Sequence, residues 1–126
     1  VPLWIGSGPV NSTESEQSFH TRIDRLMMAI EDQVDAVAID IDVDGGDGQL
    51  ILTFLSGTQI VISRQPAQRE IWVAAKSGGF HLKDRGYDWF CETTTENLTD
   101  LLNRVVTEQA GVTVTAFSEI ASEHAQ

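Results

Sequence analysis

Hydrophobic residues recur at three- and four-residue steps near both ends of the chain and alternate with polar residues in the middle. The first helical pattern covers about residues 14–37, and the second starts near Leu98 and ends at Gln109-Ala110-Gly111. Steps of three and four place apolar side chains on one side of a helix, whereas alternation places them on one face of a strand. The pattern therefore predicts two helices separated by strands.

The middle of the chain reads as a series of hairpins. The clearest strand-like runs cover residues 38–44, 50–55, 58–64, 70–75 and 87–92. The link Ser56-Gly57 has the length of a tight hairpin turn, and the paired glycines within residues 76–82 suggest a bulge or a sharp turn. Because hairpins join antiparallel neighbours, we predict an α+β two-layer sandwich, with an antiparallel sheet of about six strands and both helices on one face.

The predicted core joins the inner face of the strands to the apolar sides of the helices. Its members are Ile39, Ile41, Leu52, Phe54, Ile60, Ile62, Ile71 and Val73 on strands, with Phe19, Ile23, Leu26, Ile30, Leu98, Leu102 and Val105 on helices. Trp72 has the opposite strand phase to Ile71 and therefore points outward beside Glu70. It is either a contact residue for a partner or covered by another part of the chain.

The length of 126 residues is enough for one domain with its own core. We expect that domain to cover residues 14–117. Residues 1–13, which contain Gly6-Ser7-Gly8-Pro9, and residues 118–126 are expected to be flexible. No apolar run reaches the roughly 20 residues that a membrane-spanning helix needs. The single cysteine, Cys91, fits a reducing compartment, because it has no partner for an intramolecular disulfide.

The formal net charge of −11 argues against binding to nucleic acid or to anionic membranes. The charge is unevenly distributed. Residues 14–47 contain only two basic residues against ten acids: Glu14, Glu16, Asp24, Glu31, Asp32, Asp35, Asp40, Asp42, Asp44 and Asp47. Residues 64–85 contain mostly arginine and lysine among their charged residues. The natural ligand of the acidic end is a cation or a basic partner.

Two acidic surfaces meet where the first helix precedes the first strand. The helical period puts His20, Asp24, Glu31 and Asp35 on one stripe, and the alternation puts three aspartates of residues 40–44 on the outer strand face. Such a surface is either a solvated face or a cation site. The aspartates also resemble the opening of an EF-hand loop. That reading fails because Ile51 occupies the twelfth position and a strand follows instead of a helix.

From Phe19 to Phe117 the chain resembles the bacterial branch of the frataxin family. The most specific part is residues 62–81, with an Arg64-Gln65-Pro66 turn, an Ile71-Trp72 pair and a Gly78-Gly79-Phe80-His81 ending. The resemblance implies an iron-binding protein of iron–sulfur cluster assembly. Such a protein docks on the cysteine desulfurase and its scaffold machinery and acts there as a regulator or an iron carrier.

The resemblance also implies where the sites lie. Iron, as Fe²⁺ or Fe³⁺, would bind weakly and exchangeably at His20, Glu31, Asp32, Asp35, Asp40 and Asp42. Trp72 matches an exposed partner-contact residue, and Asp24 and Arg69 are assigned to the same partner-binding surface. The link Ala36-Val37-Ala38 is shorter than in many bacterial members, which bears on iron stoichiometry. A cytoplasmic monomer is expected, with oligomerisation in the presence of iron left open.

Two other functions compete with this one. The chain could be an acidic protein–protein interaction module whose metal binding is incidental. An enzyme is disfavoured, because the only nucleophile set, His81, Cys91 and Asp88, includes a cysteine on a predicted core face and lies in no nucleophile motif. The sequence leaves a ferroxidase side activity open.

Overall fold

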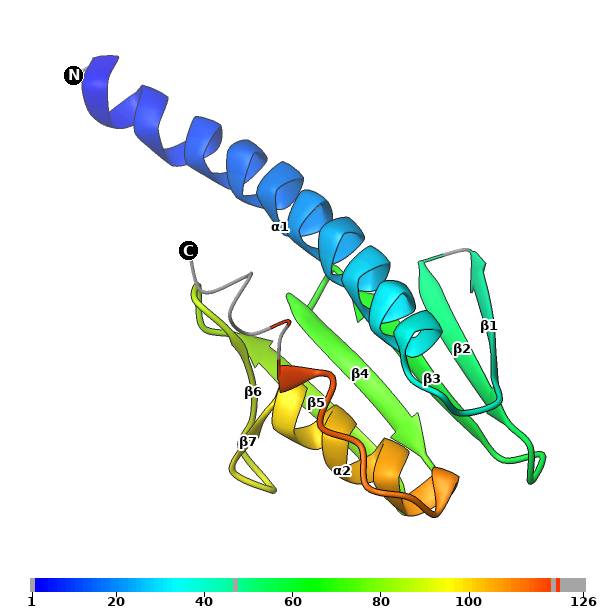
Figure 1. Ribbon diagram of the computed structural model, residues 1–126. Coiled ribbons are helices and arrows are strands. Elements are labelled where there is room, and N and C mark those ends of the chain that lie inside the picture. The colour runs from blue at the N-terminus through cyan, green and yellow to red at the C-terminus, as the bar shows by residue number, and fades with distance from the viewer. Residues whose placement is uncertain (1, 47, 119, 121–126) are drawn as a thin grey trace.

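The computed structural model describes residues 2–46, 48–118 and 120, with side chains described from residue 16 onward (Figure 1). In these residues a long helix is followed by seven strands and a second helix. The elements are α1 (Pro2–Ala36), β1 (Ile41–Gly46), β2 (Gln49–Phe54), β3 (Gln59–Gln65), β4 (Glu70–Ala75), β5 (Gly78–Asp84), β6 (Trp89–Cys91), β7 (Glu96–Asn97) and α2 (Leu98–Ala110).

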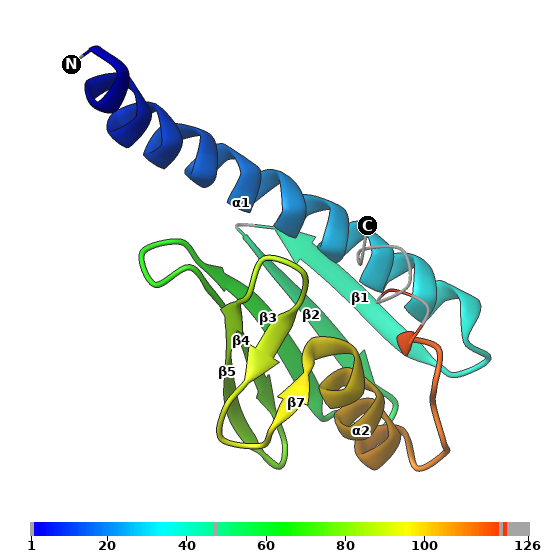
Figure 2. The same ribbon diagram turned by 90° about the vertical axis from the view of Figure 1, so that its left-hand side faces the viewer.

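The strands form one sheet in which spatial order equals chain order, and every neighbouring pair is antiparallel. Both helices lie against the same face of this sheet, and no described helix covers the other face (Figure 1). The predicted two-layer α+β sandwich is therefore confirmed. In Figure 2 the two helices lie to the right of most of the strands, on that one side of the sheet.

The core lies between the helices and the inner face of the sheet, and it contains all the residues predicted for it. Phe19, Ile23 and Ile30 of α1 meet inward-facing strand residues such as Ile62 and Ile71, each at most 1% exposed. Ile39 and Ile41 pack against the same cluster but are only half-buried, because Ile41 lies on the edge strand β1 and Ile39 precedes that strand. Alternation in the sequence thus identified the inner face correctly.

The turns follow the chemistry of their residues. Gly57 adopts a φ of 91° between β2 and β3, in the left-handed region that glycine accepts most readily. Gly111 ends α2 with a φ of 77° and donates its N–H to the carbonyl of Thr107, which is the helix ending predicted from Gln109-Ala110-Gly111.

Several element boundaries differ from the prediction. Strand β1 covers Ile41–Gly46 instead of residues 38–44, and β6 covers only Trp89–Cys91 instead of residues 87–92. Helix α1 begins at Pro2 instead of near residue 14, since helical backbone continues through residues of low helix propensity at 6–9. The two-residue strand β7 was not predicted. Ile120 is buried, so the core extends beyond Phe117 into the first residues of the segment expected to be a tail. The mobility of residues 1–13 stays a prediction, and residues 119 and 121–126 lie outside the described residues.

Candidate functional site

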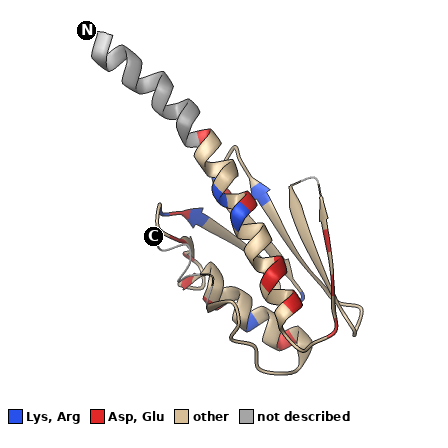
Figure 3. Ribbon diagram, turned by 45° about the horizontal axis from the view of Figure 1, so that its top comes forward, with Lys and Arg blue, Asp and Glu red and all other residues tan. Residues whose placement is uncertain are grey.

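The acidic ridge is defined here as Glu31, Asp32 and Asp35 on α1 together with Asp40 and Asp42 beside it. Asp40 directly precedes β1 and Asp42 lies on that strand. All except the half-buried Glu31 are exposed. Figure 3 shows the acidic positions gathered on the C-terminal part of α1 and along the adjacent β1. The fold thus places the acidic residues of α1 and those of β1 at the same edge of the sandwich.

Glu31 is the ridge residue of α1 that contacts β1. Its Oε1 atom would lie 3.4 Å from a Cβ placed on Gly45, so the carboxylate rests against the backbone of β1. A side chain at position 45 would crowd that carboxylate, and glycine leaves room for it. Helix α1 therefore lies close over the outermost strand at this end of the sheet.

The ridge does not form a closed metal cage. Among the residues whose side chains are described, no three His, Cys, Asp or Glu groups converge closely enough to hold a metal ion. Carboxylates spread along an exposed surface attract cations through their summed field and exchange them readily. The geometry is consistent with weak, exchangeable binding and not with a permanent structural metal.

His20 does not lie with the rest of the predicted ligands. It is separated from Glu31 by three helical turns, about 16 Å along the axis of α1. Its Nδ1 atom lies 3.1 Å from Arg64 Nη1, and Asp24 Oδ1 accepts a hydrogen bond from Arg64 Nη2. His20 and Asp24 therefore form a separate group around the guanidinium of Arg64, and they cannot share one ion with the ridge.

Asp84, the last residue of β5, is a second centre of charge pairing. It accepts hydrogen bonds from Arg22 at 2.9 Å, from Arg69 at 3.1 Å and from the backbone N–H of Gly86 at 2.8 Å. Burial raises the pKa of Asp84, but the hydrogen bonds from Gly86 and the two arginines outweigh it and hold the pKa below its ordinary value. Arg69, assigned by sequence to partner binding, is thus also part of the fold's charge pairing.

Trp72 lies on the outer sheet face as predicted, but it is half-buried and not fully exposed. Its ring stacks on His81, with centroids 4.2 Å apart and planes 7° from parallel. Its Nε1–H donates to Glu70 Oε1 at 2.7 Å. Register explains the stack, because Trp72 of β4 and His81 of β5 are directly opposite cross-strand partners. The indole is therefore covered partly by a neighbouring side chain, and one of its faces is already in contact.

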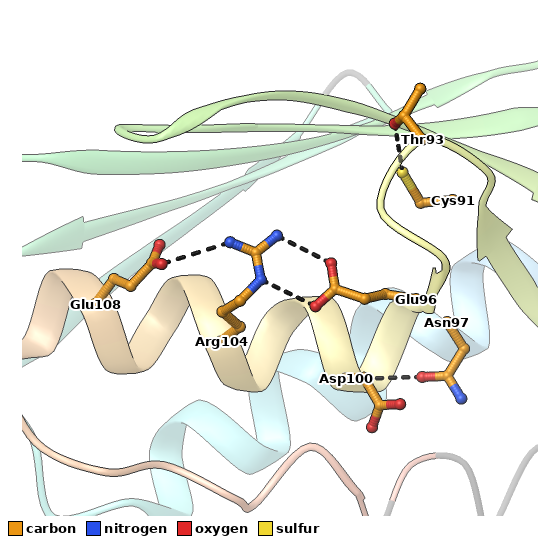
Figure 4. Close-up of polar contacts among 7 residues, drawn as sticks. All are labelled: Cys91, Thr93, Glu96, Asn97, Asp100, Arg104 and Glu108. Carbon is orange, nitrogen blue, oxygen red and sulfur yellow. Dashed lines mark hydrogen bonds and ion pairs between the residues drawn. The ribbon is translucent and has the colours of Figure 1, made fainter.

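Cys91 is fully buried, as its position on a predicted core face indicated. Figure 4 shows its sulfur close to the hydroxyl of Thr93, at 3.2 Å. Burial raises the pKa of the thiol, but hydrogen bonds from Thr93 and Thr94 outweigh it and lower the pKa. His81 belongs to the opposite, outer sheet face, and Asp88 pairs with Arg85. The structure thus separates the three members of the considered nucleophile set.

Other polar contacts in Figure 4 fasten α2 to the sheet. Arg104 makes two hydrogen bonds of 2.9 Å to Glu96 and one of 3.4 Å to Glu108. Asn97 caps the helix by accepting from the backbone N–H of Asp100 at 2.9 Å. These groups have structural partners within the chain and support the site only by holding the layers together.

The sequence did not reveal which side chains contact the predicted site residues. It did not assign Arg64 to His20, nor His81 to Trp72, nor Asp84 to its two arginines. The pairing of Trp72 with His81 was accessible in principle, because it follows from the register of one hairpin once its turn is known. The contacts of Arg64 and Arg22 join α1 to the sheet. Because their partners are far apart in the chain, no local sequence pattern indicates these contacts.

Within the described part of the chain, no helix combines the length and the apolar composition needed to cross a bilayer. The fold and the surface together define an open-faced α+β sandwich with a ridge of carboxylates at one edge and an aromatic residue on the uncovered sheet face.

Comparison with known families agrees with an open-faced α+β sandwich of this kind. The family model described as a frataxin-like domain matches residues 12–112, so the chain belongs to the frataxin family. It is similar to a protein of Stutzerimonas stutzeri named iron-sulfur cluster assembly protein CyaY, at 42% identity over 77% of this chain and 90% of the relative. A protein of the same name from Pseudomonas syringae is 40% identical over 84% and 97% of the two chains.

Solved structures show the same fold. Frataxin from Psychromonas ingrahamii superposes with a TM-score of 0.74 over 80% of this chain and 96% of that chain, at 24% identity. Trimeric frataxin from Saccharomyces cerevisiae, complexed with ferrous iron, matches with a TM-score of 0.59 over 74% of this chain and 85% of that chain, at 25% identity.

Proposed function

We propose that this protein takes part in iron–sulfur cluster assembly, where it binds iron weakly on the acidic ridge and docks on the cysteine desulfurase as a regulator or iron carrier. The observation that carries the proposal is the gathering of exposed carboxylates on the C-terminal part of α1 and along the adjacent β1, in a chain of the frataxin family. The relatives named as iron–sulfur cluster assembly proteins support the pathway.

Iron is the favoured cargo on chemical grounds. Carboxylates are hard oxygen ligands, suited to Fe²⁺ and Fe³⁺ as well as to other oxygen-preferring cations. The yeast neighbour that is complexed with ferrous iron supports the same metal. Glu31, Asp32, Asp35, Asp40 and Asp42 would share the cation, with no one of them essential. His20 lies too far along α1 to join them and contacts Arg64 instead.

Docking would use two kinds of contact. Glu70 holds the indole of Trp72 by a hydrogen bond, and His81 stacks on its ring, so the anchor loses little conformational freedom on binding. The ridge would add long-range attraction to a basic partner surface. We assign Asp24 and Arg69 to the periphery of this surface, since each is already held by a charge of opposite sign.

Such a protein would act in the bacterial cytoplasm as a carrier or regulator and not as an enzyme. The two relatives named CyaY are bacterial and are named as assembly proteins. We propose a monomer that oligomerises when iron accumulates, and the trimeric yeast neighbour supports that step.

A second candidate is an interaction module for which metal is incidental. It is favoured by one observation, namely that no three potential ligands converge among the described side chains. In that case the ridge would contact lysine and arginine side chains of the partner directly. Iron would then compete with the partner, whereas in the first proposal iron and partner bind together.

Binding of the purified desulfurase to the intact chain, with and without Fe²⁺, tests docking. We expect Trp72→Ala to weaken binding by about 2 kcal/mol or more, as truncation of an aromatic anchor does. Asp32→Asn and Asp35→Asn should also weaken binding to the desulfurase, and this loss should shrink as salt is added. Matched controls are Tyr87→Ala, another exposed aromatic residue, and Asp100→Asn, an exposed acid on α2.

Equal losses in Trp72→Ala and Tyr87→Ala would contradict a specific anchor. A ternary complex that holds both Fe²⁺ and the desulfurase would support the iron carrier, and mutual exclusion of Fe²⁺ and the desulfurase would favour the interaction module.

A further inference from the structure

The two methionines of the chain are neighbours in sequence but lie in opposite environments. Met27 belongs to the core and is 8% exposed, whereas Met28 is 65% exposed on another side of α1. An apolar side chain contributes to stability mainly when it is removed from water, so packing does not explain Met28. The thioether of Met28 is open to reagents in solution, and that of Met27 is shielded from them.

Met28 lies on the same side of α1 as the acids of the ridge. At about 100° per residue, Asp32 and Asp35 fall within about 40° of Met28 around the helix axis. Glu31 and Asp32 follow Met28 by three and four residues, the spacing at which Cβ atoms lie about 5–6 Å apart. Both aspartates are exposed and Glu31 is half-buried. The sulfur of Met28 is therefore next to the carboxylates to which we assign iron.

A thioether beside a bound iron ion has a defined chemistry with peroxide. Methionine is oxidised to its sulfoxide, and exposure of the sulfur favours the reaction. One oxygen of hydrogen peroxide forms a bond to sulfur, the O–O bond breaks, and the other oxygen leaves as water with both protons. Sulfur loses two electrons and the peroxide gains them. A metal ion that binds the peroxide polarises it and is regained at the end, so it does not enter the balance.

We propose that Met28 is an oxidation site of the acidic ridge, at which hydrogen peroxide forms the sulfoxide under the direction of iron bound to the neighbouring carboxylates. The inference rests on the proposed function, because it needs iron on the ridge. The product replaces a flexible apolar group with a polar one, and methionine sulfoxide reductases can reverse the change. The sulfoxide oxygen adds a hard donor beside Asp32, of the kind that iron accepts. The ridge thus records the meeting of its iron with peroxide.

A second exposed methionine, placed far from the ridge, makes the test quantitative. Tyr87 is 62% exposed, nearly the same as Met28, and it lies between β5 and β6, several strands away from β1. The full chain with Tyr87→Met is treated with hydrogen peroxide, with and without Fe²⁺, and sulfoxide is measured at each position by peptide mass spectrometry. Without iron, positions 28 and 87 should react at similar rates and Met27 more slowly.

Iron should separate the two exposed positions. Iron held beside the sulfur acts at an effective concentration on the order of millimolar, so with about 0.1 mM Fe²⁺ we expect oxidation at position 28 to exceed that at position 87 by about tenfold. Adding Asp32→Asn and Asp35→Asn should remove this preference, because the iron is no longer held there. Asp100→Asn is the matched control on α2 and should keep it.

The outcomes distinguish this inference from the proposed function, since Fe²⁺ binding is followed separately by NMR before peroxide is added. Ridge signals that broaden with Fe²⁺, without faster oxidation at position 28 than at position 87, would overturn the inference alone. Ridge signals that stay sharp would overturn both. A preference for position 28 that survives Asp32→Asn and Asp35→Asn would also overturn the inference, because the iron responsible would lie elsewhere.

Discussion

Asp84 illustrates how single residues of this protein hold charge inside the fold. Only 8% of its side chain is exposed, yet it lies between the guanidinium groups of Arg22 and Arg69. Those two groups in turn lie over the rings of Trp89 and Phe19, each 5.0 Å from a ring centroid. Charge pairing and aromatic packing therefore depend on the same carboxylate.

We predict that Asp84→Asn lowers the free energy of unfolding at pH 7 by about 2 kcal/mol. Breaking a fully buried pair costs about 3–5 kcal/mol, and this pair should cost less because both arginines remain partly in water. Chemical denaturation measures the change. Asp88→Asn is the matched control, since Asp88 pairs with Arg85 on an exposed turn and should cost under about 1 kcal/mol.

The pH dependence follows from the lowered pKa of Asp84. An unfolded aspartate titrates near pH 3.9, so between that value and the folded pKa the unfolded chain binds more protons. The stability contributed by Asp84 is fully present above the unfolded pKa and is lost as the pH falls through the folded pKa. Denaturation curves of the wild type and of Asp84→Asn should therefore converge in acid, and a constant difference down to pH 2 would contradict this account.

At the scale of elements, α2 depends on one face of leucine and valine side chains. Leu102 lies at the centre of this face and is fully buried. Leu102→Ala should lower the free energy of unfolding by about 2–5 kcal/mol, which combines the lost burial with the cavity left behind. Val112→Ala is the control, because Val112 is 51% exposed just beyond the helix. A loss under about 1 kcal/mol for Leu102→Ala would mean that α2 does not pack on the core as described.

The elements that sequence predicted well are those with a long periodic signal. Both helices and strands β2, β3 and β4 contain enough alternating or helical positions to define an inner face, and Ile62, Ile71 and Leu102 are buried as predicted. Strand β7 contains only Glu96 and Asn97, too few residues for any period. The early start of α1 was missed because glycine and proline at positions 6–9 argue locally against a helix.

The site residues also divide into those that periodicity predicted and those whose contacts it did not predict. The outward phase of Trp72 and the exposure of the ridge acids except Glu31 followed from periodicity alone. The stack on His81 needed the register of β4 and β5, and the contact of Arg64 with His20 joins residues 44 positions apart. Contacts of that range arise from the packing of layers, so no local pattern in the sequence contains them.

At the scale of the whole molecule, the net charge of −11 acts against folding wherever carboxylates crowd without partners. Asp35 is exposed on the ridge, one helical turn from Glu31. Asp35→Asn should raise the melting temperature at low salt, and added salt or a divalent cation should raise that of the wild type. Asp100→Asn, which removes an exposed acid from α2, should not give the same increase. A fall in melting temperature for a folded Asp35→Asn would mean that the carboxylate is structural.

The central claim is that the ridge of α1 and β1 is where this protein binds iron. An NMR titration of the full chain with Fe²⁺ under anaerobic conditions tests it most directly, because a paramagnetic ion broadens the signals nearest to it. The account predicts broadening first at Glu31, Asp32, Asp35, Asp40 and Asp42, with affinity that falls stepwise as these acids are changed to amides. Broadening centred on His81 or Cys91, with the ridge signals intact, would contradict it.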